Sequence, residues 1–127
     1  DHLVEVLGTS IKVVADQQGN PTSAIDIADA ILRLAPGLGS TPAGGIFHLC
    51  GSGSTTWCGL AQAIFAESGK LGGPAPRVEA ITTAEYPTPA RRPANSRMDT
   101  AAFTARFGFA LRPWPDAVAE TVARLLA

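Results

Sequence analysis

The most distinctive part of the sequence is Tyr86-Pro-Thr-Pro-Ala-Arg-Arg-Pro-Ala-Asn-Ser-Arg-Met98, with three of the ten prolines and three of the ten Lys/Arg residues. No acidic residue lies between Glu85 and Asp99, although the whole chain has a net charge of −1. Proline removes a backbone donor and fixes φ, so this stretch predicts a stiffened loop and neither a helix nor a central strand. Guanidinium groups match phosphate oxygens in shape and charge. The stretch is therefore either a loop that binds an anionic ligand or a solvated basic loop.

Predicted helices and strands alternate before this loop, and two further helices are predicted after it. The pattern predicts a helix end at residues 1–7, strands at 11–15, 46–50 and 77–82, helices at 23–34 and 55–69, a short helix after Asp99 that ends at Gly108, and a last helix at 117–126. Ser23-Ala-Ile-Asp26 has the form of a capping box at the start of the first full helix. This order predicts one α/β domain, and we find no internal repeat or linker that would divide it.

Composition narrows the class of protein. The 127 residues are 46% hydrophobic and 17% charged, which indicates one globular, nearly neutral domain and argues against broad nucleic-acid binding. No apolar run reaches the roughly 20 residues that cross a bilayer, so we expect no membrane contact. Cys50 and Cys58 are interpreted as reduced thiols of a cytoplasmic protein, with a disulfide as the alternative. Two histidines without a nearby Cys/His set argue against zinc.

Few residues outside the basic loop suggest chemistry. His48 lies within a predicted strand, where a packed core residue is the simpler interpretation. Trp57, in the first turn of a helix, fits the core better than a ligand-stacking position. Gly51-Ser-Gly-Ser54 lacks both the Gly-Lys-Ser/Thr of a phosphate loop and the third glycine of a dinucleotide fingerprint. Because no catalytic triad or paired carboxylate site is evident, residue chemistry alone stops at an α/β domain with one anion-binding loop.

Three segments, taken in order, resemble the dTDP-4-dehydrorhamnose reductases. They are Val14-Ala-Asp-Gln-Gln-Gly-Asn-Pro-Thr-Ser23 with the following Asp26-Ile-Ala-Asp29, then Gly45-Ile-Phe-His-Leu-Cys-Gly-Ser-Gly-Ser-Thr-Thr-Trp57, then Ile81-Thr-Thr-Ala-Glu-Tyr-Pro-Thr-Pro-Ala-Arg-Arg-Pro-Ala-Asn-Ser-Arg-Met-Asp99. The resemblance covers essentially the whole chain. It implies a Rossmann-type extended short-chain dehydrogenase/reductase, of which residues 1–127 form the C-terminal substrate-binding lobe with the last sheet strand.

The resemblance also implies an activity. Members of the family reduce the 4-keto group of dTDP-4-dehydro-L-rhamnose with NADPH or NADH, in the biosynthesis of dTDP-rhamnose for cell-wall polysaccharide. Their cofactor turn and catalytic Tyr-x-x-x-Lys lie upstream of the matching segments, and the one tyrosine here, Tyr86, is followed by Pro-Thr-Pro-Ala. The chain opens Asp-His-Leu-Val and its one methionine is Met98. We therefore expect a fragment without the N-terminal dinucleotide-binding domain, with no catalytic or cofactor-binding residue and no activity of its own.

The part of the reaction left to this chain is substrate binding. Arginines of the basic loop would contact the diphosphate of a dTDP-sugar or brace the loop, amides would bond sugar or base edges, and an aromatic ring would flank the ligand. The expected set is Arg91, Arg92, Asn95, Arg97, Gln17 and Trp57. Which arginine contacts phosphate stays open at this point.

Two alternatives remain open. The chain would instead be a non-catalytic homologue like the regulatory subunit of methionine adenosyltransferase, or part of a reductase, epimerase or dehydratase of another sugar nucleotide. Some members of the family are thought to dimerise through a metal bridged by glutamates. Ile25 and Arg124 stand at two of those positions, so we expect no metal-bridged dimer and leave the oligomeric state open.

Overall fold

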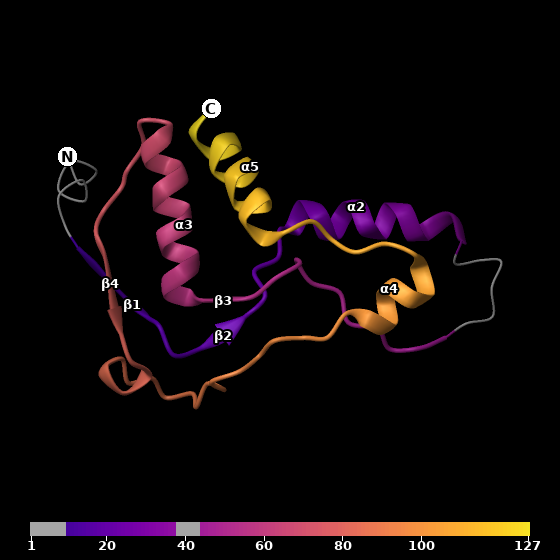
Figure 1. Cartoon of the computed structure of the whole chain (residues 1–127), viewed down its shortest axis with the longest axis horizontal. Coiled ribbons are helices and arrows are strands. Elements are labelled where there is room, and N and C mark those ends of the chain that lie inside the picture. The colour runs from indigo at the N-terminus through magenta and orange to yellow at the C-terminus, as the bar shows by residue number, and fades with distance from the viewer. Residues whose placement is uncertain (1–9, 38–43) are drawn as a thin grey trace.

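The computed structural model describes residues 10–37 and 44–127, and the helix end predicted at residues 1–7 lies outside them. Its elements are β1 (Ile11–Val14), β2 (Gln18–Gly19), α2 (Ala24–Leu34), the 3-10 helix η1 (Ala35–Gly37), β3 (Thr55–Thr56), α3 (Trp57–Lys70), β4 (Val78–Ile81), the 3-10 helix η2 (Thr83–Glu85), α4 (Ala101–Phe107) and α5 (Trp114–Leu126) (Figure 1). The strands predicted at 11–15 and 77–82 are confirmed as β1 and β4. The four predicted helices after residue 22 are confirmed as α2, α3, α4 and α5.

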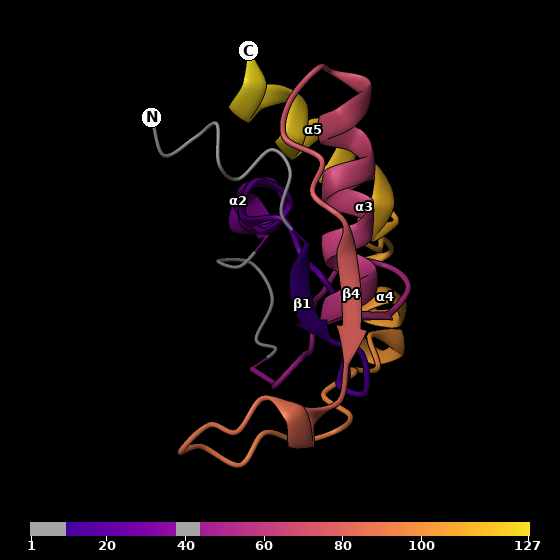
Figure 2. The ribbon, with the colours of Figure 1, turned by 90° about the vertical axis from the view of Figure 1, so that its left-hand side faces the viewer.

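A parallel strand pair forms one end of the molecule. β1 and β4 pair in register from Ile11 opposite Val78 to Val14 opposite Ile81. Helix α3 contacts both strands and α5 packs on α3. Figure 1 shows α2 and α4 at the end away from this pair, and Figure 2 shows α3 lying along β1 and β4. The order strand, helix, parallel strand is a crossover connection, as an α/β fold requires.

Local signals set the ends of the helices. The Ser23 hydroxyl accepts a hydrogen bond from the Ile25 amide at 3.2 Å, and the Thr56 hydroxyl accepts one from the Gly59 amide at 3.1 Å. Such caps satisfy amides that have no partner within the helix. Gly108 ends α4 with φ at 75°, a left-handed conformation that glycine adopts without strain.

Only the first half of the predicted capping box forms at the start of α2. The Ser23 hydroxyl caps the helix, but the Asp26 side chain does not bond back to the Ser23 amide. The carboxylate of Asp26 accepts hydrogen bonds from Arg112 Nε at 3.0 Å and from the Arg112 terminal nitrogen at 2.7 Å. Arg112 also bonds Glu120, which in turn bonds Arg124. These bonds raise the pKa of Arg112 and lower that of Glu120, because each stabilises the charged form. The long-range ion pair therefore outcompetes the local cap.

Small and aliphatic side chains, with one phenylalanine, make up the core of the described residues. The buried apolar residues are Ala30, Cys50, Cys58, Ile81, Phe103, Leu111, Ala117 and Val122. Both cysteines are free, as the interpretation of reduced thiols requires, and burial raises the pKa of the Cys50 thiol. Leu125 and Leu126, in the last turn of α5, are 79% and 43% exposed.

The strand predicted at residues 46–50 is not formed. Within residues 10–37 and 44–127, the segment has no strand partner. Its side chains still alternate, with Phe47 half-buried against the Phe107 ring at 5.1 Å between centroids. Ile46 is 91% exposed and His48 is exposed, so the expectation of a packed His48 is wrong. A strand needs a neighbour for its backbone groups, and apolar content alone does not provide one.

No helix among the described residues has the length and apolar content to cross a bilayer.

Candidate functional site

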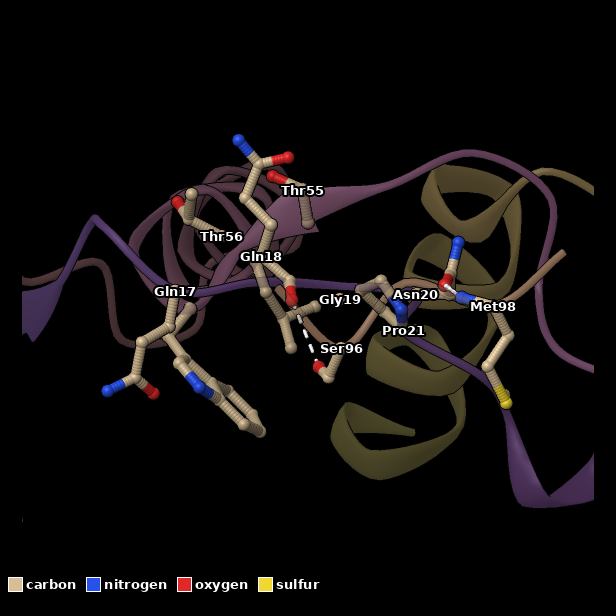
Figure 3. Close-up of a pocket in the computed structure, with 11 residues that line it drawn as sticks. Gln17, Gln18, Gly19, Asn20, Pro21, Thr55, Thr56, Ser96 and Met98 are labelled. Carbon is tan, nitrogen blue, oxygen red and sulfur yellow. Dashed lines mark hydrogen bonds between the residues drawn. The ribbon is translucent and has the colours of Figure 1, made fainter. Parts of the chain in front are cut away.

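A small hollow forms where three separate segments meet. It measures about 190 Å³ and is lined by the turn from Gln17 to Pro21, the start of α3 with Trp57, and the end of the basic loop at Ser96 and Met98 (Figure 3). Figure 3 shows that Gln18 and Gly19 run between Thr55 and Thr56 on one side and Ser96 on the other. Segments almost 80 residues apart in the sequence thus share one wall.

Backbone hydrogen bonds hold the end of the basic loop in place. The Gln18 amide donates to the Ala94 carbonyl at 2.8 Å, and the Gln18 carbonyl accepts from the Ser96 amide at 2.9 Å. The Ser96 hydroxyl donates to the same carbonyl at 2.9 Å. Residues 94–96 therefore lie beside β2 as a short parallel bridge.

Asn20 completes this attachment. Its Nδ2 donates to the Gly53 carbonyl at 2.7 Å, and its Oδ1 accepts from the Met98 amide at 2.8 Å. One side chain thus joins the turn after β2, the turn before β3 and the end of the basic loop. The sequence carries no signal for these two long-range bonds.

A second hollow opens beside the first. It measures about 430 Å³ and is lined by Lys12, Val13, Val14, Gln17, Trp57, Tyr86, Thr88 and Arg92. Gln17 and Trp57 line both hollows. Trp57 is 56% exposed, so the core interpretation of this ring is wrong. Its position leaves the ring available as an apolar wall.

The beginning of the basic loop is anchored through Asp16. Its carboxylate accepts from the Thr83 amide at 2.9 and 3.0 Å and from the Thr83 hydroxyl at 2.6 Å. These bonds favour the ionised form and lower the pKa of Asp16. The same Thr83 hydroxyl accepts from Gln17 Nε2 at 3.1 Å, which fixes the amide of Gln17 at the edge of both hollows.

The expected site residues divide into two groups. Gln17, Trp57 and Arg92 meet at the second hollow. Asn95 and Arg97 interact with each other, because Asn95 Oδ1 accepts from the Arg97 amide at 3.1 Å and from Arg97 Nε at 3.0 Å. These two residues and Arg91 are exposed and are not among the lining residues of either hollow. Sequence reasoning missed Lys12, Tyr86, Thr88 and Asn20 as neighbours of the site.

The described residues include no group of three or more His, Cys, Asp or Glu side chains that would hold a metal ion. Ile25 is half-buried in the first turn of α2, and the guanidinium of Arg124 is bonded to Glu120. Neither side chain offers an oxygen ligand.

The fold combines a parallel strand pair, a helix that packs on both strands and a hollow beside a basic loop. This is the fold of the substrate-binding portion of an extended short-chain dehydrogenase/reductase. The chain belongs to the RmlD substrate binding domain family, whose profile matches residues 4–127.

Relatives support this assignment. The dTDP-4-dehydrorhamnose reductase of Sinorhizobium fredii is 42% identical over 119 residues, which cover 91% of this chain and 40% of that protein. A probable dTDP-4,6-dihydroxy-2-methyloxan-3-one 4-ketoreductase of Streptomyces antibioticus is 37% identical over 125 residues, 97% of this chain and 40% of that protein. The chain thus spans about two fifths of the length of these curated relatives.

Solved structures show the same fold. A dTDP-4-dehydrorhamnose reductase from Clostridium acetobutylicum has a TM-score of 0.83 at 28% identity, covering 99% of this chain and 43% of the other. The reductase from Bacillus anthracis, solved in complex with NADP, has a TM-score of 0.79 at 25% identity, covering 91% of this chain and 38% of the other.

Proposed function

We propose that this chain is the substrate-binding lobe of a dTDP-4-dehydrorhamnose reductase. The enzyme would reduce the 4-keto group of dTDP-4-dehydro-L-rhamnose to give dTDP-L-rhamnose, using NADPH or NADH. Residues 1–127 would form one lobe, with the dinucleotide-binding domain and the catalytic Tyr/Lys pair outside this chain. The observation that carries the proposal is the basic loop. None of its three arginines pairs with a carboxylate anywhere in residues 10–37 and 44–127, and one of them, Arg92, lines the aromatic-lined second hollow.

The chemistry of the ligand fits this arrangement. A nucleoside diphosphate sugar carries negative charge on its phosphates, flat apolar surface on its base and hydroxyl groups on its sugar. Arg92 provides a guanidinium for a phosphate, and Trp57 provides a face for a ring. The Gln17 amide is held by Thr83, and its carbonyl oxygen, which has no hydrogen-bond partner among the described residues, can accept a hydrogen bond from a sugar hydroxyl. These groups bind and orient the substrate, which is what precise hydride and proton transfer requires.

The glycines of the turn before β3 pack closely against other parts of the chain. An ideal Cβ on Gly51 would lie 2.3 Å from the Pro21 carbonyl oxygen, and one on Gly53 would lie 3.2 Å from the Trp114 ring. Both glycines therefore serve close packing within the lobe and do not form a cradle for a pyrophosphate.

The proposal is tested by titrating dTDP into the full-length protein by calorimetry. Arg91→Ala, Arg92→Ala and Arg97→Ala are compared with Arg77→Ala, an exposed arginine with no side-chain partner among the described residues. Losing one charged hydrogen bond to phosphate weakens binding by about 10- to 100-fold. We expect that loss for at least Arg92→Ala and none for Arg77→Ala. Binding by all three loop variants at wild-type affinity would refute a role of the loop in nucleotide binding.

A second candidate is a ketoreductase of a different dTDP-sugar. It is favoured by the similarity to the Streptomyces antibioticus protein, which is 37% identical over 97% of this chain, although this similarity is weaker than that to the reductases. NADPH and NADH oxidation by the full-length protein, measured with dTDP-4-dehydrorhamnose and with other dTDP-keto sugars, separates the two. The sugar with the highest kcat/KM identifies the substrate.

A further inference from the structure

Lys12 is an exposed cation at the edge of the second hollow. It is the one charged side chain of β1, whose other members are Ile11, Val13 and Val14. It is exposed, and it lines the second hollow together with Arg92. Its ammonium makes no hydrogen bond or ion pair with any residue that the structure describes. An unpaired cation on an otherwise apolar strand contributes little to folding.

Acidic side chains lie near Lys12, but none of those that the structure describes forms an ion pair with it. Glu85 accepts from the Thr82 amide at 2.7 Å and from the Thr82 hydroxyl at 2.8 Å. These bonds, and to a smaller extent the charge of Lys12, lower the pKa of Glu85. Glu79 lies opposite Lys12 in the strand register but forms no ion pair with it. The ammonium is therefore free to meet a ligand.

The hollow also has two aromatic residues. Tyr86 is 60% exposed and Trp57 is 56% exposed, and both line the same space as the two cations. Exposed aromatic rings beside cations are the combination that binds a nucleotide, because the ring stacks on the base while the cation meets the phosphate.

We propose that Lys12 is a phosphate-binding residue of this hollow, which holds one phosphate of a nucleoside diphosphate while Arg92 holds the other and the rings of Trp57 and Tyr86 flank the base. This inference rests on the proposed function for the identity of the base, and it does not depend on hydride transfer. The ammonium acts as a point charge and the guanidinium as a planar fork, so the two cations differ in their demands on geometry.

The test uses the full-length protein and three probes: dTDP, thymidine and inorganic pyrophosphate. The chain has one other lysine, Lys70, which pairs with Glu67 at 2.6 Å and does not line the hollow, so Lys70→Ala is the matched control. Loss of one exposed charged contact weakens phosphate binding by about 5- to 10-fold. We expect Lys12→Ala to show this loss for dTDP and pyrophosphate, with thymidine unchanged, and Lys70→Ala to bind all three as the wild type does.

Acylation of lysine amines supplies a measurement that needs no variant. Saturating dTDP should slow the modification of Lys12 and leave that of Lys70 unchanged, as followed by mass spectrometry of the peptides. Equal dTDP affinity of Lys12→Ala and wild type, or equal labelling of Lys12 with and without dTDP, overturns the inference.

The outcomes separate this inference from the proposed function. If the wild type prefers UDP or ADP to dTDP and Lys12→Ala weakens that binding, the phosphate site stands and the proposed substrate falls. If dTDP binds and Lys12→Ala has no effect, the proposed function stands and the role of Lys12 falls. If the wild type binds none of these nucleotides and no pyrophosphate, both are overturned.

Discussion

Replacing Asn20 by alanine should loosen the basic loop and destabilise the protein. The change removes the hydrogen bonds to the Gly53 carbonyl at 2.7 Å and from the Met98 amide at 2.8 Å. Each intramolecular hydrogen bond contributes about 1 kcal/mol net, and water partly replaces these two because both are exposed. We therefore expect a loss of about 1–2 kcal/mol. With a urea slope of about 1.5 kcal/mol per molar, the unfolding midpoint falls by about 1 M.

Two variants sharpen this experiment. Asn20→Asp keeps the acceptor for the Met98 amide but sets a carboxylate oxygen against the Gly53 carbonyl in place of the donor, so it should also lower the midpoint. Gln62→Ala removes an exposed amide of α3 without a hydrogen-bond partner among the described residues and should leave the midpoint unchanged. Trypsin cleavage after Arg97 should be faster in Asn20→Ala, because local opening exposes that bond. An unchanged midpoint together with an unchanged cleavage rate would refute the idea that Asn20 holds the end of the basic loop in place.

Two further changes test the packing and the anchor of the site. Gly51→Ala places a Cβ 2.3 Å from a backbone carbonyl and should cost about 1–3 kcal/mol in urea unfolding, whereas Gly44→Ala, with open space around it, should cost less than about 0.5 kcal/mol. Asp16 has a lowered pKa when folded, so its contribution is present above its unfolded pKa and lost as pH falls through the folded value. Between pH 6 and pH 3 the thermal midpoint of wild type should therefore drop further than that of Asp16→Asn; equal drops contradict the anchor.

The helices were predictable because their signals are local. Apolar spacing at Ile27, Ala30, Ile31 and Leu34 and the Ser23 cap together specified α2, and Gly108 specified the end of α4. Each signal lies within one or two turns of the residue that it determines. Tertiary context did not need to be known for these elements.

The failed predictions concern burial, which depends on what packs against a segment. Ile46 and His48 have the sequence of a buried strand, yet both are exposed, because no strand among the described residues pairs with them. Asp26 looked like a capping residue until Arg112, 86 positions later, was placed beside it. Trp57 looked like core for the same reason, since its first-turn position does not reveal which face remains open. A single sequence shows each segment but does not show which other segments pack against it in the fold.

The candidate site lies between these two cases. The basic loop was predictable from its own prolines and arginines, and its meeting with Gln17 and Trp57 entered only through the family resemblance. Lys12 gave no local signal, because one lysine in an apolar strand is an ordinary exposed residue. Its significance depends on Arg92, which lies 80 positions away in the sequence and lines the same hollow.

The two parts of the basic loop, residues 87–93 and residues 94–98, are held in place to different extents. This difference affects how the arginines of each part can contact a ligand. Residues 94–98 are fixed by backbone bonds to Gln18 and by the amide of Asn20, and Arg97 is further braced by Asn95. Within the described part of the chain, residues 87–93 make one side-chain hydrogen bond, from the Thr88 hydroxyl to the Ala90 carbonyl at 2.9 Å. A preorganised cation loses little entropy on binding, whereas a loosely held one must be ordered at that moment. Arg97 therefore contributes a fixed positive field near the hollow, while Arg92 provides an adjustable contact. Ordering of residues 87–93 therefore adds an entropic cost to any contact that a ligand makes with Arg92.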